Sequence, residues 1–269
     1  MTVNDLAARG FDRAGDAYER GRPSYPRAAV DLLVRELGIA AGSDVLDVGA
    51  GTGKFTRLLA PTGARLVAVE PAAGMRAVLA GVLPGLPVLE GSAEALPLGH
   101  ASVDTVVVAQ AFHWFDGPAA LAEIARVLRP GGGLGLIWNV RDESAGWVAD
   151  LTALLDEHAG DAPRYRNGHW RAAFDSTPLF APLAEHRFAS EHAGDVAAMR
   201  DRVASVSFVA ALPDDADDAR ERLLRRVEAV VAPQADAAGR VVMPCRTDVY
   251  WTRARPPGAS AGRRPAGPP

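Results

Sequence analysis

The sequence predicts an α/β fold in which helices cover both faces of a doubly wound, mostly parallel sheet. Short apolar runs alternate with amphipathic helical stretches through residues 29–138, and only short connections separate them. The first apolar run passes into a helix through a glycine-rich turn at residues 49–53. Turns of this kind expose backbone N–H groups at a strand–helix junction, where nucleotide-like ligands bind.

The first strands and helices follow from local signals. A helical repeat at residues 29–38 ends at Gly38, and the apolar run 44–48 then predicts the first strand. A second strand is predicted at 65–69 and is followed directly by Glu70. The other elements of this part are expected as helices at 54–60 and 73–79 and a short strand at 88–90.

The next strand and helix complete the regular part of the chain. Residues 103–109 (VDTVVVA) are almost all β-branched or small, which suits a parallel strand buried on both faces. Residues 118–128 place apolar side chains on one helical stripe, and Pro130 ends that helix. A further strand is expected at 134–138. Because strands and helices alternate, the crossovers should be right-handed.

The alternation weakens after Asn139, and residues 160–182 are irregular and polar. The expected elements are helices at 147–158, 196–203 and 220–231 and strands at 185–190 and 247–253. Charges at the ends of the helix at 220–231 complement its dipole, so we interpret them as solvated structure. Residues 256–269 have low complexity and are expected to form a disordered tail. We therefore predict a single domain over residues 1–255.

Composition excludes several classes of protein. The chain of 269 residues has a formal net charge of −4, which gives no general basic field for nucleic acid. Its single cysteine, Cys245, cannot form an internal disulfide, and no Cys/His cluster has the spacing of a metal site. No apolar run approaches ~18 residues, and the N-terminus is too polar for a signal peptide. We expect a cytoplasmic protein with no metal, membrane or nucleic-acid partner.

The glycine spacing and one acid narrow the choice of ligand. The dinucleotide fingerprint is Gly-x-Gly-x-x-Gly, whereas this chain has the shorter Gly-x-Gly-x-Gly, and the P-loop pattern is absent. Glu70 ends the second strand, where a carboxylate accepts hydrogen bonds from both hydroxyls of a ribose and disfavours a 2′-phosphate. A tight turn without a ligand is the alternative for the glycines alone, and Glu70 argues against it.

Five motifs in order, VLDVGAGTGKFTRLLA, AVEPAAGM, GSAEALPL, VDTVVVAQAFHWFD and ARVLRPGGGL, resemble those of class I S-adenosylmethionine-dependent methyltransferases. Within that group the chain is similar to methyltransferase type 11 and trans-aconitate-methyltransferase-like small-molecule enzymes, a subgroup of which shares the segment FDRAGDAYERGRPSYP. The resemblance is strong over residues 11–140, weak over 141–239 and moderate at the last strand. It implies a seven-stranded, Rossmann-like sheet with an antiparallel last strand and a helical lid at 141–232.

The resemblance also implies a binding site for S-adenosylmethionine. The matching residues are Asp47 at the cofactor amine, Gly49, Ala50, Gly51 and Gly53 under its methionine part, and Glu70 at the ribose. The other implied contacts are Pro71, Met75, Ala93 and Glu94 at the adenine, Gln110 beside the sulfonium, and Tyr18 and Arg22 at the cofactor carboxylate. Glu94 is alternatively a solvated loop acid, and Tyr18 with Arg22 alternatively marks an N-terminal helix that only docks its aromatic residues.

The acceptor is expected beside the loop that follows the strand at 103–109. His113 is the one imidazole among these motifs, and its ordinary pKa suits proton transfer near neutrality, so it is the candidate base. Trp114 and Phe115 are expected to form an apolar wall, while a packed loop is the alternative. Tyr18 and Trp170 are further candidates for acceptor binding. Trp170 belongs to a cluster with Arg164, Arg166, His169 and Arg171, which either clamps an anionic acceptor or is solvated.

Together these features predict methyl transfer from S-adenosylmethionine to a small organic acceptor. The methyl group is already activated, so the protein mainly aligns donor and acceptor, and only a protonated nucleophile needs a base. Transfer to oxygen is favoured, while carbon and nitrogen stay open. The alternatives are a protein that binds the cofactor without catalysis and an NAD-dependent oxidoreductase. The glycine spacing and the absence of a Tyr-x-x-x-Lys motif argue against the oxidoreductase.

Overall fold

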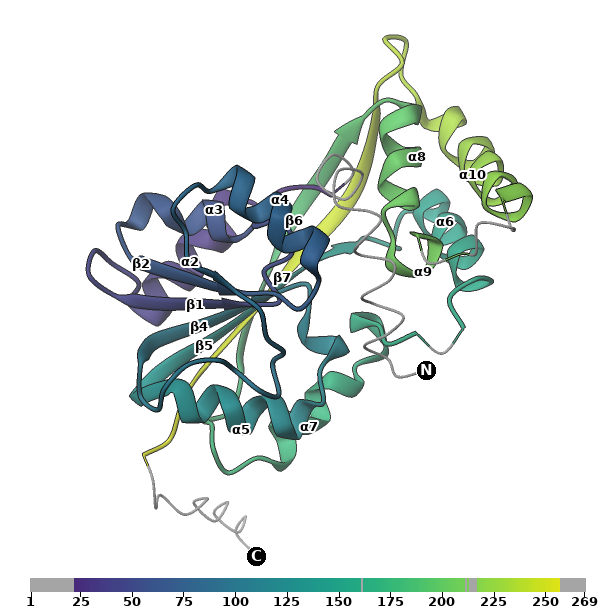
Figure 1. The fold of residues 1–269 in the computed structure, drawn as a ribbon. Coiled ribbons are helices and arrows are strands. Elements are labelled where there is room, and N and C mark those ends of the chain that lie inside the picture. Colours follow the sequence, from purple (N-terminus) through teal and green to yellow (C-terminus); the bar gives the residue numbers. More distant parts are fainter. Residues whose placement is uncertain (1–21, 161, 211, 213–216, 257–269) are drawn as a thin grey trace, which may run out of the picture.

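The computed structural model describes residues 22–160, 162–210, 212 and 217–256 (Figure 1). Tyr18 and all of the expected tail after Pro256 lie outside these ranges. Within them, none of the helices combines the length and the apolar character that crossing a bilayer demands.

One sheet contains seven strands. They are β1 (Asp44–Val48), β2 (Arg65–Val69), β3 (Val88–Leu89), β4 (Val103–Ala109), β5 (Leu128–Arg141), β6 (Ala184–Gly194) and β7 (Val241–Arg253). Their order is β3-β2-β1-β4-β5-β7-β6. Strands β1 to β5 pair in parallel, and β7 is antiparallel to both β5 and β6. The predicted fold class is therefore confirmed, and the strand order reverses between β1 and β4, where α/β sheets bind ligands.

Helices cover both faces of the sheet. Figure 1 shows α2 (Arg27–Leu37), α3 (Thr56–Leu59) and α4 (Ala73–Val82) on one face, with α5 (Gly117–Val127) and α7 (Ala172–Ser176) on the other. Helix α2 ends as predicted at Gly38, which has a left-handed backbone with φ of 69°. Helix α3 is shorter than the expected helix at 54–60 because a 3-10 turn that contains Pro61 follows it, and proline has no N–H to continue the helix.

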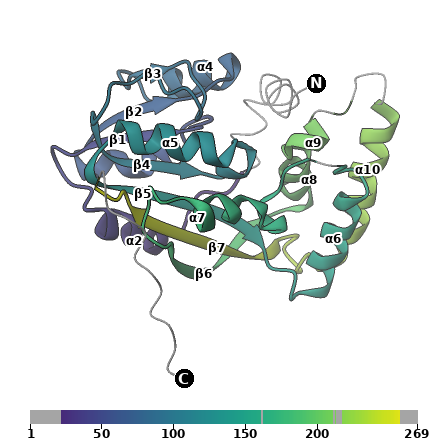
Figure 2. The ribbon, with the colours of Figure 1, turned by 90° about the horizontal axis from the view of Figure 1, so that it is seen from below.

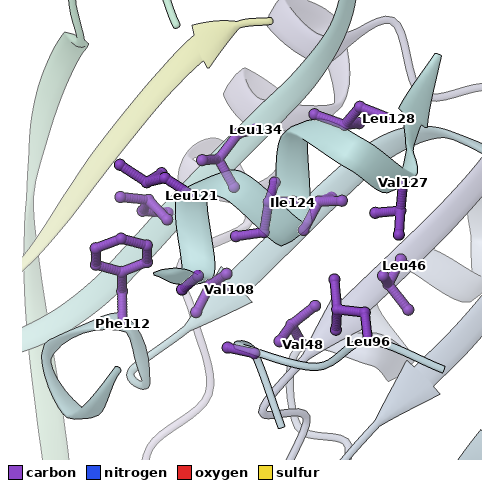
Figure 3. Close-up of a cluster of buried hydrophobic side chains, with 14 of the residues drawn as sticks. Leu46, Val48, Leu96, Val108, Phe112, Leu121, Ile124, Val127, Leu128 and Leu134 are labelled. Atoms are coloured by element: carbon purple, nitrogen blue, oxygen red, sulfur yellow. The ribbon is translucent and has the colours of Figure 1, made fainter. Parts of the chain in front are cut away.

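Strand β4 is buried on both faces, as its composition predicts. Val106 and Val108 belong to the hydrophobic core under α5, while Val107 belongs to the core under α2. Figure 3 shows the first of these cores, in which Leu121 and Ile124 of α5 pack over β1 and β4. The two cores hold the carboxyl ends of β1 and β4 in place, and the candidate site is built there.

The second half of the sheet extends farther than the sequence predicts. Strands β6 and β7 pair continuously from Ala184 opposite Trp251 to Gly194 opposite Val241. Pro244 obscures this pattern in the sequence because proline cannot donate a ladder hydrogen bond. Strand β5 pairs with β7 only as far as Cys245, and beyond it Asp142 N donates to Pro244 O at 3.1 Å, a bond that needs no N–H from the proline.

The outer ends of β6 and β7 carry a separate group of helices. Figure 2 shows α6 (Gly146–Asp156), α8 (Val196–Ala204), α9 (Ser207–Ala210) and α10 (Asp217–Val231) beside the sheet, and we call them the helical cluster. Their shared hydrophobic core includes Leu151, Leu155, Met199, Val203, Leu223 and Val227, with Val241, Met243 and Cys245 from β7.

The segment 141–232, which the sequence groups as one lid, divides between two parts of the fold. Strand β6 belongs to the sheet, and Trp170 and Ala173 pack in the core under α5. The rest of the segment contributes the helical cluster.

Candidate functional site

The glycine turn after β1 contains three left-handed residues. Gly49, Gly51 and Gly53 have φ values of 69°, 57° and 81°. A Cβ atom on Gly49 would lie 2.9 Å from Ala111 Cβ, and one on Gly53 would lie 2.2 Å from Leu79 Cδ1, so packing excludes larger residues at both positions. Among the described residues, no atom lies within 4 Å of a Cβ built on Gly51. Gly51 is therefore the point at which a ligand can approach the backbone.

The glycine turn is fixed to the end of β2. The backbone N–H of Ala50 donates to Val69 O at 3.2 Å. Glu70 is 5% exposed, and its carboxylate accepts from Gly51 N through Oε2 and from Ala72 N through Oε1, each at 2.9 Å. These two bonds hold the carboxylate beside Gly51.

Asp47 is a buried acid with half of its hydrogen-bonding capacity unused. Its side chain is 2% exposed, and Oδ2 accepts from Thr56 Oγ1 at 2.7 Å. Oδ1 has no hydrogen-bond partner among the described residues. Burial raises the pKa of Asp47 to about 7, with a further contribution from the negative charge of Glu70, against the lowering effect of the Thr56 hydrogen bond. A cationic donor at Oδ1 would stabilise the ionised carboxylate.

The residues expected at an adenine differ in their exposure. Pro71 is exposed, whereas Met75 and Ala93 are 2% and 3% exposed. Glu94 accepts a hydrogen bond from Asp116 N at 2.9 Å through Oε1, which ties its loop to the start of α5. Glu94 therefore has a structural partner and is not a free loop acid.

Gln110 ends β4 in an unusual conformation. Its φ of 60° lies in the left-handed region, which costs a non-glycine residue about 1–2 kcal/mol. Its backbone N–H donates to Ile137 O at 2.9 Å, and its side-chain Nε2 donates to Asn139 O at 3.2 Å. Both bonds join the end of β4 to β5, and such strain is found where a functional group must be held in place.

His113 follows Gln110 in a 3-10 turn and accepts a hydrogen bond. Trp138 Nε1 donates to its Nδ1 at 3.2 Å. An indole nitrogen can only donate, so we assign the proton of the neutral ring to Nε2. Burial lowers the pKa of His113 to about 3, with a smaller contribution from Arg22. The imidazole is therefore neutral and its Nδ1 lone pair is occupied.

A cavity of about 170 Å³ lies at the carboxyl ends of β4 and β5. It brings together three predicted site residues, Gln110, His113 and Trp114, with Arg22. Arg22 Nη2 donates to Ser205 O at 3.2 Å, so it reaches the helical cluster. The other lining residues are Asn139, Val140, Arg141, Glu143, Pro163, Arg164, Tyr165, Arg166, Arg202, Val206 and Phe208.

Phe115 and Trp170 lie outside the lining of this cavity. The Phe115 ring packs against the glycine turn, where its Cζ is 3.4 Å from a Cβ built on Gly49. Trp170 is 7% exposed in an aromatic core, with its ring centroid 4.8 Å from that of Trp138 and 5.1 Å from that of Tyr250. Trp170 also stacks on Tyr165, which lines the cavity, so it supports the cavity wall, whereas Phe115 packs at the glycine turn.

The basic cluster around Trp170 is largely neutralised by acids. Arg164 and Arg166 both form ion pairs with Asp156, and Arg171 pairs with Glu185 at 2.7 Å. These arginines are therefore poor candidates for the anion clamp that the sequence suggested.

Sequence reasoning missed several polar residues of the cavity, among them Asn139, Arg141 and Arg202. The sequence could have indicated Arg202, because this arginine lies on the buried stripe of helix α8 together with Met199 and Val203. An arginine on an apolar helical stripe is an exception to amphipathic patterning. Asn139 and Arg141 lie at the end of a strand that the sequence predicted to stop at Trp138.

Comparison with known proteins supports the sequence motifs. A family model described as a methyltransferase domain matches residues 46–136. An uncharacterized methyltransferase-like protein of Schizosaccharomyces pombe is 37% identical over 199 residues, which are 74% of this chain and 77% of the relative. An uncharacterized methyltransferase of Mycobacterium tuberculosis is 52% identical over 156 residues, 58% of this chain, and the match spans only 62% of that relative's length.

Two further similarities are to a protein of known structure and to a named O-methyltransferase. The crystal structure of the YcgJ protein from Bacillus subtilis superposes with a TM-score of 0.57 at 18% identity, covering 86% of this chain and all (100%) of that one, which supports the fold alone. The malonyl-[acyl-carrier protein] O-methyltransferase of Serratia marcescens is 38% identical over 138 residues, 49% of this chain and 52% of the relative.

The glycine turn, the acid at the end of β2 and the seven-stranded sheet agree with these matches. Membership of the family also implies S-adenosylmethionine as the methyl donor. The chain therefore belongs to the class I S-adenosylmethionine-dependent methyltransferases.

Proposed function

We propose that the chain transfers the methyl group of S-adenosylmethionine to an oxygen atom of a small organic acceptor. The donor binds on the glycine turn, and the acceptor binds in the cavity beside Gln110 and His113. The observation that carries the proposal is the arrangement at the turn. Within the described part of the chain, Gly51 faces open space and Asp47 Oδ1 has no hydrogen-bond partner, and Asp47 and the Glu70 carboxylate flank the same turn.

The residues of the turn fit the donor chemically. When bound, S-adenosylmethionine supplies a methyl group activated by a sulfonium. Asp47 Oδ1 is a buried acceptor that suits an ammonium group, and the fixed Glu70 carboxylate suits two ribose hydroxyls. The shortened glycine turn lets a ligand approach the Gly51 backbone.

The cavity suits an acceptor held next to that donor. Gln110 and Asn139 lie at the carboxyl ends of adjacent strands, so the cavity adjoins the position where family enzymes hold the sulfonium. Arg202, Val206 and Phe208 close it from the helical cluster, which we propose as the acceptor lid. The lid excludes water and orients the acceptor, and alignment is the main requirement of the reaction.

Two observations favour oxygen as the acceptor atom. The relative in Serratia marcescens is named as an O-methyltransferase of a malonyl carrier protein, so its acceptor carries a carboxyl group. In this chain the cavity lining includes Arg22, Arg141 and Arg202 besides Arg164 and Arg166, which pair with Asp156, and Glu143 is its one carboxylate, so the lining favours an anionic acceptor. An ionised carboxylate is a nucleophile without loss of a proton, so it needs no base.

We also assign His113 a role different from the predicted base. Its Nδ1 accepts from Trp138, and its pKa is lowered to about 3, so it takes up a proton poorly at neutral pH. The remaining Nε2–H is a donor on a residue that lines the cavity. His113 therefore orients the acceptor by donating a hydrogen bond.

Binding and turnover experiments test the function together. Calorimetry on the full chain should show binding of S-adenosylhomocysteine and not of NAD. Incubation with S-adenosylmethionine and a panel of carboxylic acids, phenols and amines should release S-adenosylhomocysteine with at least one carboxylic acid. Tight binding of NAD alone would identify an oxidoreductase, and cofactor binding without turnover on any acceptor class would identify a binding protein.

The role of His113 predicts a flat pH profile. With a carboxylate acceptor and saturating donor, kcat should not change between about pH 5 and pH 8, because the imidazole stays neutral throughout. Replacing His113→Gln keeps an N–H donor and should lower kcat less than about tenfold, whereas His113→Leu should lower it about 10–100-fold. A rise in kcat centred near pH 6–7 that disappears in His113→Gln would restore the role of base.

A further inference from the structure

We propose that Arg202 and Arg141 form an anion subsite that binds a carboxylate group of the acceptor, away from the oxygen that is methylated. The inference rests on the proposed function, because it concerns the same cavity. It names the substrate class as small molecules with at least two polar ends, of which one is anionic. Neither arginine was recognised from the sequence, and both line the cavity beside Gln110 and His113.

Arg202 is a buried cation without an acidic partner. Its side chain lies on the inner stripe of α8 and is 8% exposed. Its Nη1 atom has no hydrogen-bond partner among the described residues, and no carboxylate of those residues forms an ion pair with it. Burial lowers the pKa of Arg202 to about 9, and the charges of Arg22 and Arg141 contribute to this lowering. An arginine in this state is stabilised by any anion that enters the cavity.

Arg141 presents a second guanidinium to the same space. It ends β5, and its Nε donates to Thr152 Oγ1 at 3.0 Å, which fixes the side chain. Burial lowers its pKa to about 10, with Arg22 again contributing. The bond through Nε leaves the terminal nitrogens of the fork for a planar anion, and guanidinium groups suit bidentate binding of carboxylates.

The acids near the cavity compensate this charge only in part, because Glu143 and Asp156 raise the pKa of Arg141 but burial and Arg22 still lower it overall. Asp156 already pairs with both Arg164 and Arg166. Glu143 also lines the cavity, and its carboxylate lies 3.8 Å from Arg166. Arg141 and Arg202 therefore keep net positive charge in a buried space, which destabilises the protein until an anion binds.

The bound anion is an anchor and not the reacting group. A carboxylate that accepts bidentate hydrogen bonds from guanidinium groups has its lone pairs engaged and is a weak nucleophile. The reacting oxygen must therefore belong to a second group, which lies at the end of the cavity lined by Gln110 and His113. Dicarboxylates and hydroxy acids have this two-ended chemistry, whereas simple phenols and amines do not.

The test measures anion binding to the full chain saturated with S-adenosylhomocysteine. The probe anions are glutarate and citrate. Glutaramide is the uncharged control with the same carbon chain as glutarate. For the wild-type protein, millimolar glutarate or citrate should raise Tm by several degrees and bind in calorimetry, while glutaramide should do neither. Arg202→Met should weaken anion binding at least tenfold. Arg200→Met is the matched control on the same helix, because Arg200 pairs with Glu221 and Glu228 and does not line the cavity.

Arg202→Met also separates a binding role from a structural one. Without anions its Tm should equal or exceed that of the wild type, because the substitution removes an uncompensated buried charge. If Arg202→Met does not fold, Arg141→Met should give the same loss of anion binding. Equal binding of glutarate and glutaramide, or unchanged anion binding in the variants, would overturn the subsite. Failure of S-adenosylhomocysteine to bind the wild type would instead refute the proposed function.

Discussion

Replacing Gly51→Val should abolish measurable binding of S-adenosylhomocysteine, with a loss of at least about 100-fold in affinity. The Cβ of Gly51 would project into the open space that we assign to the ligand. The branched side chain would fill the close approach that the glycine provides. The backbone φ of 57° adds strain of about 1–2 kcal/mol, which a folded domain tolerates. Calorimetry with S-adenosylhomocysteine measures the loss.

Gly239→Val is the matched control for this substitution. Gly239 has φ of 75° and likewise has no atom within 4 Å of a built Cβ, but it lies in the turn before β7. Both variants should lose similar stability in thermal unfolding, and only Gly51→Val should lose the ligand. Wild-type affinity in Gly51→Val would show that the ligand does not approach the glycine turn.

The affinity for S-adenosylhomocysteine should rise about tenfold per pH unit between pH 5 and 7 and level off above pH 7. Burial raises the pKa of Asp47 to about 7, so the empty site must lose a proton before it can pair with the ligand ammonium. Asp47→Asn should bind at least about 30-fold more weakly at pH 8 and lose the pH dependence. Asp104→Asn, at the start of β4, should keep both affinity and pH dependence.

Stability should change in the opposite direction over the same pH range. The folded-state pKa of Asp47 lies above its ordinary value of 3.8, so the folded state binds a proton that the unfolded chain has released. The stability from this proton is fully present below about pH 4 and is lost as the pH rises to about 7, at up to about 1.4 kcal/mol per unit. Denaturant titrations at several pH values measure this slope. If the slope of stability against pH persists in Asp47→Asn, a titratable group other than Asp47 causes it.

The parts of the fold that local sequence determines were predicted closely. Strands β1, β2 and β4 have the predicted bounds because each is a short apolar run between clear turn signals. Strands β5, β6 and β7 are longer than predicted because their outer halves are paired with one another and with the helical cluster. That pairing is a tertiary contact with no local pattern, and Pro244 hides it further.

In the candidate site, too, local motifs can be read from the sequence, whereas tertiary contacts cannot. Gly51 and Glu70 were found because the turn and the strand end carry them as a local motif, and the structure joins them by a hydrogen bond. His113 lines the cavity, and its tautomer depends on Trp138, which no spacing rule relates to it. Arg202 of α8 and Arg141 of β5 line the same cavity, although no local sequence pattern relates them.

The continuous pairing of β6 with β7 joins two parts of the molecule that have separate hydrophobic cores. One strand, β7, contributes Val249 to the core under α2 and Val241 to the core of the helical cluster. The two ends of β7 therefore pack in separate cores and share a single ladder of hydrogen bonds. We expect the amide hydrogens at the helical-cluster end to exchange independently of those at the α2 end in hydrogen-exchange measurements.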